Sequence, residues 1–268
     1  MNKIIFITYA THNERLFDIL LESAKKNNIN LNVLGYNEKW DNWKKRATSL
    51  LNFLNNIDDN KLICHIDGFD SIILGGEEEL YNKFNKYYKD KKIVFSSDNS
   101  NHLSINYYKN KKFGMCHNNF ISAGMFIGYN YYVKKILEDF IKSNYSDDQK
   151  FFVSLCNKDD NIGIDNNILF YNYQYFFNDY DLKYNNNRLI VPILDGKNIE
   201  NNTPVIISAP GNININSILK NFNLNKPLEY KRELFGYIIK NGRDIIKMFL
   251  IEIILSILII IIIIKIIQ

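Results

Sequence analysis

Short apolar segments typical of buried strands alternate along this chain with amphipathic segments typical of helices. The strand-like segments are rich in β-branched residues, whereas the helix-like segments carry apolar residues three and four positions apart. The expected strands are 3–9, 31–34, 61–66, 93–96, 124–129 and 203–208, and the expected helices are 14–27, 40–55, 77–88, 131–143 and 147–155. This alternation predicts an α/β fold, in which helices flank a mostly parallel sheet, over a single domain at residues 1–219.

The charge balance argues against one broad class of function. Lys and Arg total 33 and Asp and Glu total 29, which gives a net charge of +4. Proteins dedicated to nucleic acids usually carry a strong basic excess, so we expect no nucleic-acid partner.

The three cysteines give no signature of a zinc site or of a disulfide framework. Cys64, Cys116 and Cys156 are widely spaced, and no two of them form a C-x-x-C pair. This pattern favours reduced, buried thiols in a cytosol-like compartment.

The last part of the chain is strongly apolar. Residues 245–267 read IIKMFLIEIILSILIIIIIIKII. A helix of about 23 residues is about 34 Å long, enough to cross a hydrocarbon layer of about 30 Å. We therefore expect a C-terminal hydrophobic helix that serves as a transmembrane anchor. An apolar helix that packs on the domain is the alternative.

A basic connector is expected at residues 220–244, between the domain and this anchor. It contains Lys231, Arg232, Lys240 and Arg243. The positive-inside bias places such a flank on the cytoplasmic side of a membrane. We therefore expect the catalytic domain to be cytoplasmic.

The segment LICHIDGFDSIIL carries the clearest chemical signal. An apolar strand leads into Asp67 and Asp70, with Gly68 between them. Two carboxylates on a tight bend after a central strand meet at the carboxyl edge of the sheet, where ligands bind in α/β folds. Carboxylate oxygens suit Mg²⁺ or Mn²⁺, which also bind phosphate oxygens. The alternative is that Asp67 caps a turn and Asp70 is a solvated surface charge.

Two further segments hold candidate binding residues. Ser122 and Gly124 belong to a small-residue stretch before an apolar run, where a sugar or nucleotide could lie against the backbone. Ordinary packing at the start of a strand is the alternative. Asp147 and Asp148 begin an expected helix, so they either cap that helix or bind the sugar and accept a proton from the acceptor.

The order of these segments resembles the glycosyltransferase domain of the procollagen lysyl hydroxylases and related collagen-type glycosyltransferases. The matching pieces run from about residue 3 to 212 and are ITYAT, LGYNEKW, HIDGFDSIILGG, ISAGMFIGY, DDQKFF, IDNNILF and PVIISAPGN. This resemblance implies a GT-A fold, a UDP-sugar donor, and Mn²⁺ or Mg²⁺ as the metal.

Several roles follow from the resemblance, position by position. Asp67 and Asp70 match the metal-binding D-x-x-D motif, and Phe69 occupies the aromatic place beside the nucleotide base or ribose. Trp40 and Lys44 fall near donor-pocket positions, although the loop between them is shortened in this chain.

The catalytic assignment also follows from the resemblance, with one departure. Asp147 and Asp148 match the acidic cluster next to the transferred sugar. The family has a further histidine ligand where this chain has Ser208, and a hydroxyl is a poorer metal ligand than imidazole. His65 is not an obvious replacement, because strand alternation points it away from the face of Ile66.

These features predict a metal-dependent transferase that moves a hexose from a UDP-sugar to a hydroxyl of a protein or glycan acceptor. Glucose or galactose as the sugar, and hydroxylysine of a collagen-like protein as the acceptor, are implied by the resemblance alone. A nucleotidyltransferase is one alternative, although ITYATHNER supplies no glycine-rich phosphate loop. A degenerate, membrane-tethered sugar-binding or nucleotide-binding protein is the other, because of Ser208.

Overall fold

The computed structural model describes residues 3–98, 103–173, 182–195, 198–210, 215–225, 250 and 253–265. The helices are α1 (Phe17–Lys26), α2 (Trp43–Leu54), α3 (Glu77–Tyr88), α4 (Leu103–Phe113), α5 (Asn130–Lys142), α6 (Asp148–Cys156), α7 (Asn216–Leu219) and the 3-10 helix η1 (Lys220–Phe222). The strands are β1 (Ile4–Tyr9), β2 (Leu31–Leu34), β3 (Leu62–Asp67), β4 (Ser71–Ile73), β5 (Ile93–Ser97), β6 (Ile121–Tyr129), β7 (Ile162–Asp165), β8 (Phe170–Asn172), β9 (Lys183–Asn185), β10 (Arg188–Asp195), β11 (Asn198–Asn202) and β12 (Ile206–Ser208).

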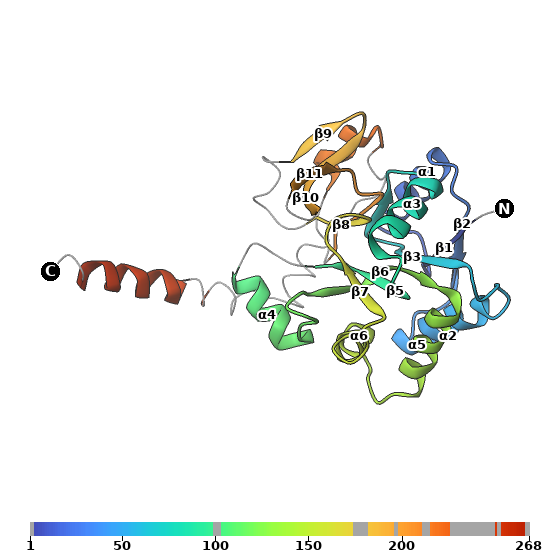
Figure 1. Ribbon diagram of the computed structural model, residues 1–268, viewed down its shortest axis with the longest axis horizontal. Coiled ribbons are helices and arrows are strands. Elements are labelled where there is room, and N and C mark those ends of the chain that lie inside the picture. Colours follow the sequence, from blue (N-terminus) through green and yellow to red (C-terminus); the bar gives the residue numbers. More distant parts are fainter. Residues whose placement is uncertain are drawn as a thin grey trace.

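A six-stranded sheet with the order β2-β1-β3-β6-β5-β7 forms the centre of the domain (Figure 1). The pairs β1–β2, β1–β3 and β5–β7 are parallel, whereas β6 runs antiparallel to both of its neighbours. The prediction of a mostly parallel α/β sheet is therefore confirmed. The described part of the chain adds two three-stranded sheets, β4-β12-β8 and β11-β10-β9.

The central sheet separates two hydrophobic cores. Side chains of β3 alternate between them: Ile66 packs in the core that includes residues of α1 and α3, and Ile63 in the core that includes residues of α2, α5 and α6. Figure 1 shows these two helix groups on opposite sides of the sheet. Because strand side chains alternate between faces, a strand covered on both faces is apolar throughout. The LICHI run of β3 is buried for this reason.

Gly128 of β6 lies against the backbone of β5. A Cβ atom on Gly128 would lie 2.7 Å from the carbonyl oxygen of Lys92 and 2.9 Å from Cα of Ile93. We expect Gly128→Ala to lower the free energy of unfolding by about 1–3 kcal/mol, because the strand must shift to admit the methyl group. Urea unfolding measures this. Lys158 is exposed after the end of α6, so Lys158→Ala is the control, and an equal loss in both variants would contradict the prediction.

Asp165, at the end of β7, is a buried carboxylate that organises the connection to β8. It accepts hydrogen bonds from the backbone of Leu169 and Phe170 at 2.9–3.1 Å and from the hydroxyl of Tyr88 at 2.8 Å. Burial raises the pKa of Asp165 from 3.8 to about 6, although the backbone donors and Tyr88 oppose the shift. The folded protein therefore holds this proton more tightly than the unfolded chain does.

The raised pKa predicts a pH-dependent effect of Asp165→Asn. In the native protein, the contribution of Asp165 to stability is complete below about pH 4 and falls as the pH rises to about 6. The stability lost in the variant should thus be greater at pH 4 than at pH 7, by about 3 kcal/mol. Urea midpoints at both pH values test this. Asp160 is exposed, so Asp160→Asn should show no such difference, and a pH-independent loss for Asp165→Asn would contradict the assignment.

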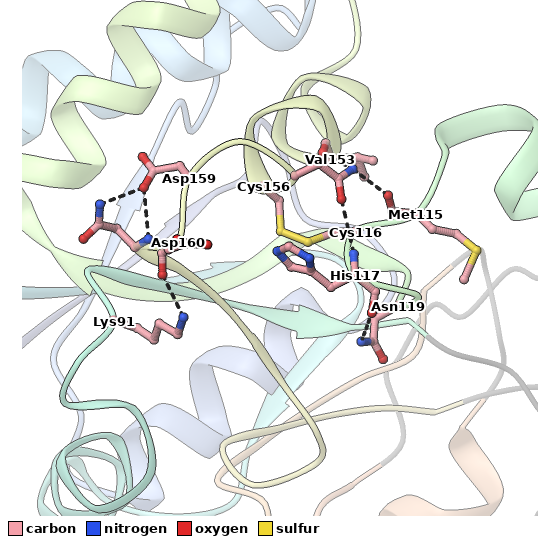
Figure 2. Close-up of a disulfide and its surroundings, with 11 residues drawn as sticks. Lys91, Met115, Cys116, His117, Asn119, Val153, Cys156, Asp159 and Asp160 are labelled. Carbon is pink, nitrogen blue, oxygen red and sulfur yellow. Dashed lines mark hydrogen bonds between the residues drawn. A yellow bond between two sulfur atoms is a disulfide. The ribbon is translucent and has the colours of Figure 1, made fainter.

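The structure corrects the expectation for the cysteines. Cys116 and Cys156 form a disulfide with a Cα–Cα distance of 5.8 Å (Figure 2), whereas Cys64 is free and buried. The fold brings the turn before β6 next to the end of α6. The two residues are 40 positions apart, and that spacing carries no local signal of pairing.

The structure describes two parts of the C-terminal region, where a connector and an anchor were expected. Phe222 and Leu224 are buried in the core, so the packed domain continues past residue 219.

Residues 253–265 form a separate helix whose side chains are exposed, and in Figure 1 it lies apart from the domain. Among the described residues, no helix is both long and apolar enough to cross a membrane, so the anchor at 245–267 is not confirmed. Residues 226–249, 251–252 and 266–268 lie outside the described part.

Candidate functional site

The D-x-x-D segment forms a tight turn at the carboxyl edge of the sheet. Asp67 ends β3 opposite Tyr9, which ends β1, and its carboxylate accepts a hydrogen bond of 3.0 Å from the backbone of Phe69. A Cβ on Gly68 would lie 2.9 Å from the hydroxyl of Thr8 and 3.0 Å from the carbonyl of Tyr9. The turn therefore packs directly against β1 and requires glycine at this position.

The two carboxylates of this turn share one electrostatic environment. Burial raises the pKa of Asp70 well above its ordinary value, the charge of Asp67 raises it further, and the guanidinium of Arg15 opposes both effects. Arg15 forms an ion pair with Asp70 in which the two side chains are only 15% and 13% exposed. Two acidic groups this close are stabilised by a cation between or beside them.

Arg15 is a site residue that sequence reasoning missed. It lies between β1 and α1 with a left-handed backbone (φ 55°), and its guanidinium also donates to the carbonyl of Ala209 at 3.4 Å. The next residue, Leu16, donates its backbone N–H to the carbonyl of Phe69 at 3.1 Å, which holds this loop against the D-x-x-D turn. Its position could have identified Arg15: it is a basic residue in the loop after the first strand, and that loop lies at the sheet edge where α/β folds bind ligands.

The small residues of β6 meet the acidic turn directly. A Cβ on Gly124 would lie 3.2 Å from Oδ2 of Asp67, and the backbone N–H of Gly124 donates to the hydroxyl of Ser122 at 3.4 Å. The register of β5 against β6 shifts between Phe95 and Ser96, so β6 is irregular where it passes Asp67. Bulges of this kind are over-represented beside active sites.

His65 lies on the same face of β3 as Asp67, two residues away, and sequence reasoning set it aside. Its Nδ1 donates to the carbonyl of Gly124 at 3.1 Å, and its ring stacks on Phe126 with centroids 5.0 Å apart. Burial, assisted by the charge of Arg46, lowers the pKa of His65 to about 3. The ring is therefore neutral. The period-two alternation of strands could have identified it, because residues 65 and 67 face the same way.

Asp147 and Asp148, the acidic residues at the start of α6, make different contacts. Asp147 is the N-cap and accepts a hydrogen bond of 3.0 Å from the backbone of Lys150. Asp148 is buried and forms an ion pair with Arg46 of α2. Burial raises the pKa of Asp148, and Arg46 opposes that shift. Asp148 is thus the member of the pair that is held inside the fold.

A row of contacts connects Asp148 with the carboxyl end of β1. Arg46 lies over the ring of Trp43 at 4.6 Å, Trp43 packs edge-on against Trp40 at 4.9 Å, and Trp40 packs edge-on against Tyr9 at 6.2 Å. Tyr9 of β1 is the residue that pairs with Asp67 of the neighbouring strand β3. Trp40 is 42% exposed, so part of its ring is available to a ligand.

The two remaining donor-side candidates lie in different surroundings. Phe69 contacts His12 and Phe17, with ring centroids 5.3 and 6.5 Å apart. Lys44 donates to the carbonyls of Ile141 and Ser143 at 3.1 and 2.5 Å, so its ammonium group is engaged at the C-terminal end of α5. Phe69 is part of the D-x-x-D turn, whereas the hydrogen bonds of Lys44 are made with α5.

The residues around the D-x-x-D turn fit a divalent cation and an anionic ligand. Asp67 and Asp70 supply oxygen ligands of the kind that Mn²⁺ and Mg²⁺ prefer. Several polar side-chain atoms of the described residues are buried without a hydrogen-bond partner, and three of them belong to residues at or beside this turn: Oγ1 of Thr8, Nε of Arg15 and Nε2 of His65. Unpartnered buried polar atoms are costly, and a bound ligand is one way to satisfy them. Ser208, buried at the end of β12, offers no imidazole.

Comparisons with known proteins agree on one family. A family model described as the PLOD GT domain matches residues 1–231. The chain is 26% identical over 166 residues to the "Multifunctional procollagen lysine hydroxylase and glycosyltransferase" of Caenorhabditis elegans, an alignment that covers 57% of this chain and 22% of that protein. It is 28% identical over 166 residues to human "Procollagen-lysine,2-oxoglutarate 5-dioxygenase 2", covering 58% of this chain and 22% of the human protein.

The matched region is therefore about a fifth of each of these relatives. Among solved structures, a galactosyltransferase named LgtC, in complex with donor and acceptor sugar analogues, aligns over 87% of this chain and 92% of its own, with 12% identity and a TM-score of 0.45.

Proposed function

Because this chain belongs to the PLOD GT domain family of glycosyltransferases, we propose that it transfers a hexose, glucose or galactose, from a UDP-sugar to a hydroxyl acceptor with the help of Mn²⁺ or Mg²⁺. The observation that carries the proposal is the close approach of Asp67 to Gly124 of β6 at one sheet edge, with the charge of Asp67 acting on Asp70 in the same turn. This is the edge where α/β folds bind their ligands.

In the proposed reaction, Asp67 and Asp70 hold the metal. When bound, that ion would neutralise the charge that develops on the departing diphosphate. Arg15 adds a fixed positive charge on the same side, since its guanidinium already lies against Asp70. Gly124 has no side chain, so its backbone lies close to the carboxylate of Asp67, beside which the donor would bind.

The acceptor side of the proposed site is formed by α6 and α2. Asp148 orients the transferred sugar or accepts the proton of the acceptor hydroxyl, and Arg46 fixes the position of its carboxylate. A raised pKa suits a group that takes up a proton during the reaction. Asp147 supports this arrangement as the cap of the helix.

We propose a protein hydroxyl as the acceptor, with hydroxylysine of a collagen-like chain as the first candidate. The support is the naming of two relatives as procollagen lysine-modifying proteins. A glycan hydroxyl would use the same chemistry, so both kinds of acceptor belong in the assay.

The decisive experiment is a screen of UDP-sugars with the full-length protein. We expect UDP to be released from UDP-glucose or UDP-galactose in the presence of Mn²⁺, with faster release when a hydroxylysine peptide is added. Chelation of the metal should stop the release. Binding of UDP without turnover of any donor would refute the transferase proposal and favour a binding protein.

For localisation, we propose that the apolar segment at 245–267 attaches the chain to a membrane, with the domain on the cytoplasmic side. Its described part, 253–265, exposes side chains such as Ile257 and Ile260 at 50% and 56%, and such a surface favours an apolar environment. After detergent-free lysis, we expect the full chain in the membrane fraction and a chain shortened to residue 231 in the supernatant. Full-length protein in the supernatant would reject this proposal.

A further inference from the structure

A cluster of three potential metal ligands lies away from the D-x-x-D turn. The sulfur atoms of Cys116 and Cys156 and a ring nitrogen of His117 all lie within 4.8 Å of one another. Figure 2 shows the His117 ring beside the two sulfurs. Both cysteines are fully buried, whereas His117 is exposed, so one side of the cluster faces solvent.

The backbone at His117 is held in an uncommon conformation. His117 and Asn118 both have left-handed φ angles, 46° and 65°. They occupy the centre of a tight turn closed by two reciprocal backbone hydrogen bonds of 2.8 Å between Cys116 and Asn119. Residues other than glycine seldom adopt this conformation, and it costs free energy. Here it places the imidazole next to the sulfur of the preceding residue.

The turn is also fastened to the end of α6. Asn157, the residue after Cys156, donates its side-chain amide to the carbonyl of Met115 at 2.8 Å and accepts a hydrogen bond of 3.3 Å from the backbone of His117. The two sides of the cluster are thus held together by contacts that do not involve the S–S bond. The three ligands would remain neighbours after that bond is broken.

Two thiolates and one imidazole are a ligand set that suits Zn²⁺. With Zn–S about 2.3 Å and Zn–N about 2.1 Å, a tetrahedral ion separates its ligand atoms by about 3.5–3.8 Å. The His117 nitrogen, within 4.8 Å of both sulfurs, must come about 1 Å closer to them. The two sulfurs must separate from the about 2.0 Å of a disulfide bond to about 3.8 Å once the bond is reduced, which rotation of the cysteine side chains can supply. Water can complete the fourth position from the side on which His117 is exposed.

We propose that Cys116, Cys156 and His117 form a redox-gated zinc site, which binds Zn²⁺ when the disulfide is reduced. A dithiol reductant supplies two electrons and two protons to the S–S bond, which gives two thiols and leaves the reductant as its own disulfide. Binding of Zn²⁺ then releases the two thiol protons, and the neutral imidazole completes the protein ligands.

The position of the cluster gives the metal a structural role. Cys156 ends α6, the helix that begins at Asp148, and Cys116 precedes β6, the strand that carries Gly124. A covalent bond joins these two elements in the oxidised protein, and the metal would join them in the reduced protein. The two sides of the proposed transferase site would then keep their spacing in either redox state.

Cobalt(II) provides a direct test on the full chain, because its complexes with thiolates absorb strongly. The protein is reduced with a dithiol, freed of reductant under argon and titrated with CoCl₂. We expect a thiolate-to-cobalt charge-transfer band and the visible bands of tetrahedral cobalt, saturating at one equivalent and abolished by Zn²⁺. The oxidised protein should show neither set of bands. Cobalt on the carboxylates of Asp67 and Asp70 gives no thiolate band, so the two sites are distinguished.

Three variants complete the test. His117→Ala leaves both thiols in place and should weaken cobalt binding by at least about tenfold, since loss of a supporting group outside the ligand shell alone costs that much. The double variant Cys116→Ser with Cys156→Ser should lose the charge-transfer band. Cys64→Ala, which removes the free cysteine, should leave the titration unchanged. Absence of the thiolate band in the reduced native protein, or unchanged affinity in His117→Ala, would overturn the proposal.

Discussion

Replacement of Asp67 by Asn is expected to reduce metal-dependent release of UDP from the UDP-sugar by about a hundredfold or more. The amide is nearly the same size as the carboxylate and can still accept the hydrogen bond from the backbone of Phe69. It carries no charge, so the site loses one of its two anionic oxygen ligands. Loss of a single well-placed electrostatic group from an active site commonly costs this much in rate.

The measurement is UDP release at saturating donor, together with calorimetric titration of Mn²⁺. The melting temperature of Asp67→Asn should stay close to that of the native protein, which separates loss of function from loss of fold. Asp90 is exposed, so Asp90→Asn is the control for a lost surface charge and should keep full activity. Unchanged turnover in Asp67→Asn would remove the D-x-x-D turn from the proposed mechanism.

Replacement of Arg15 by Ala should have a large effect on the metal-free protein. Arg15 lies beside Asp70, whose pKa is already raised by burial and by Asp67. Removal of one partner from a mostly buried ion pair leaves an uncompensated charge and typically costs about 3–5 kcal/mol. We expect a loss toward the lower end of that range, because both side chains keep some contact with solvent, being 15% and 13% exposed.

The same variant tests whether Arg15 acts as a resident counter-ion for the metal site. Mn²⁺ should stabilise Arg15→Ala more than it stabilises the native protein, because the ion can replace the lost positive charge beside Asp70. Binding of UDP should weaken by about ten- to a hundredfold if the guanidinium contacts the diphosphate, the range expected for a charged hydrogen bond. Urea midpoints in EDTA and in Mn²⁺, with UDP titrations, give both quantities.

Arg15→Lys is the matched control for these measurements. It keeps the positive charge but loses the planar fork of the guanidinium, so its stability in EDTA should lie between those of the native protein and Arg15→Ala. If Mn²⁺ stabilised all three proteins equally, Arg15 would have no part in the metal site.

The sequence predicted the central architecture well, because that information is local. Apolar periodicity located β1, β3 and α3 within a residue or two, and the expected helix at 77–88 coincides with α3. Asp67 and Gly124, more than fifty positions apart, were both selected as candidates, and the structure places them in contact. Each was recognisable from its own neighbours in the sequence.

The features that sequence reasoning missed depend on distant partners. β4 has three residues and gains its stability by pairing with β12, far along the chain. Arg15 acquires a role only because the loop after β1 folds onto the D-x-x-D turn. The Cys116–Cys156 disulfide likewise requires the folded arrangement of α6 and β6. No local sequence pattern predicts these contacts between residues that are far apart in the chain.

The reversed direction of β6 separates the two sides of the candidate site along the chain. Because β6 runs against β3 and β5, the residues beside Asp67 lie at its beginning, directly after the α4 segment. Neither α4 nor the turn that follows it contributes a strand to the six-stranded sheet. We expect insertions in α4 to leave the register of the sheet intact, unlike insertions in the turn that holds Cys116. Changes in α4 would thus alter the surface beside the proposed sugar position while leaving Asp67 and Asp70, the proposed metal ligands, in place on β3 and the turn that follows it.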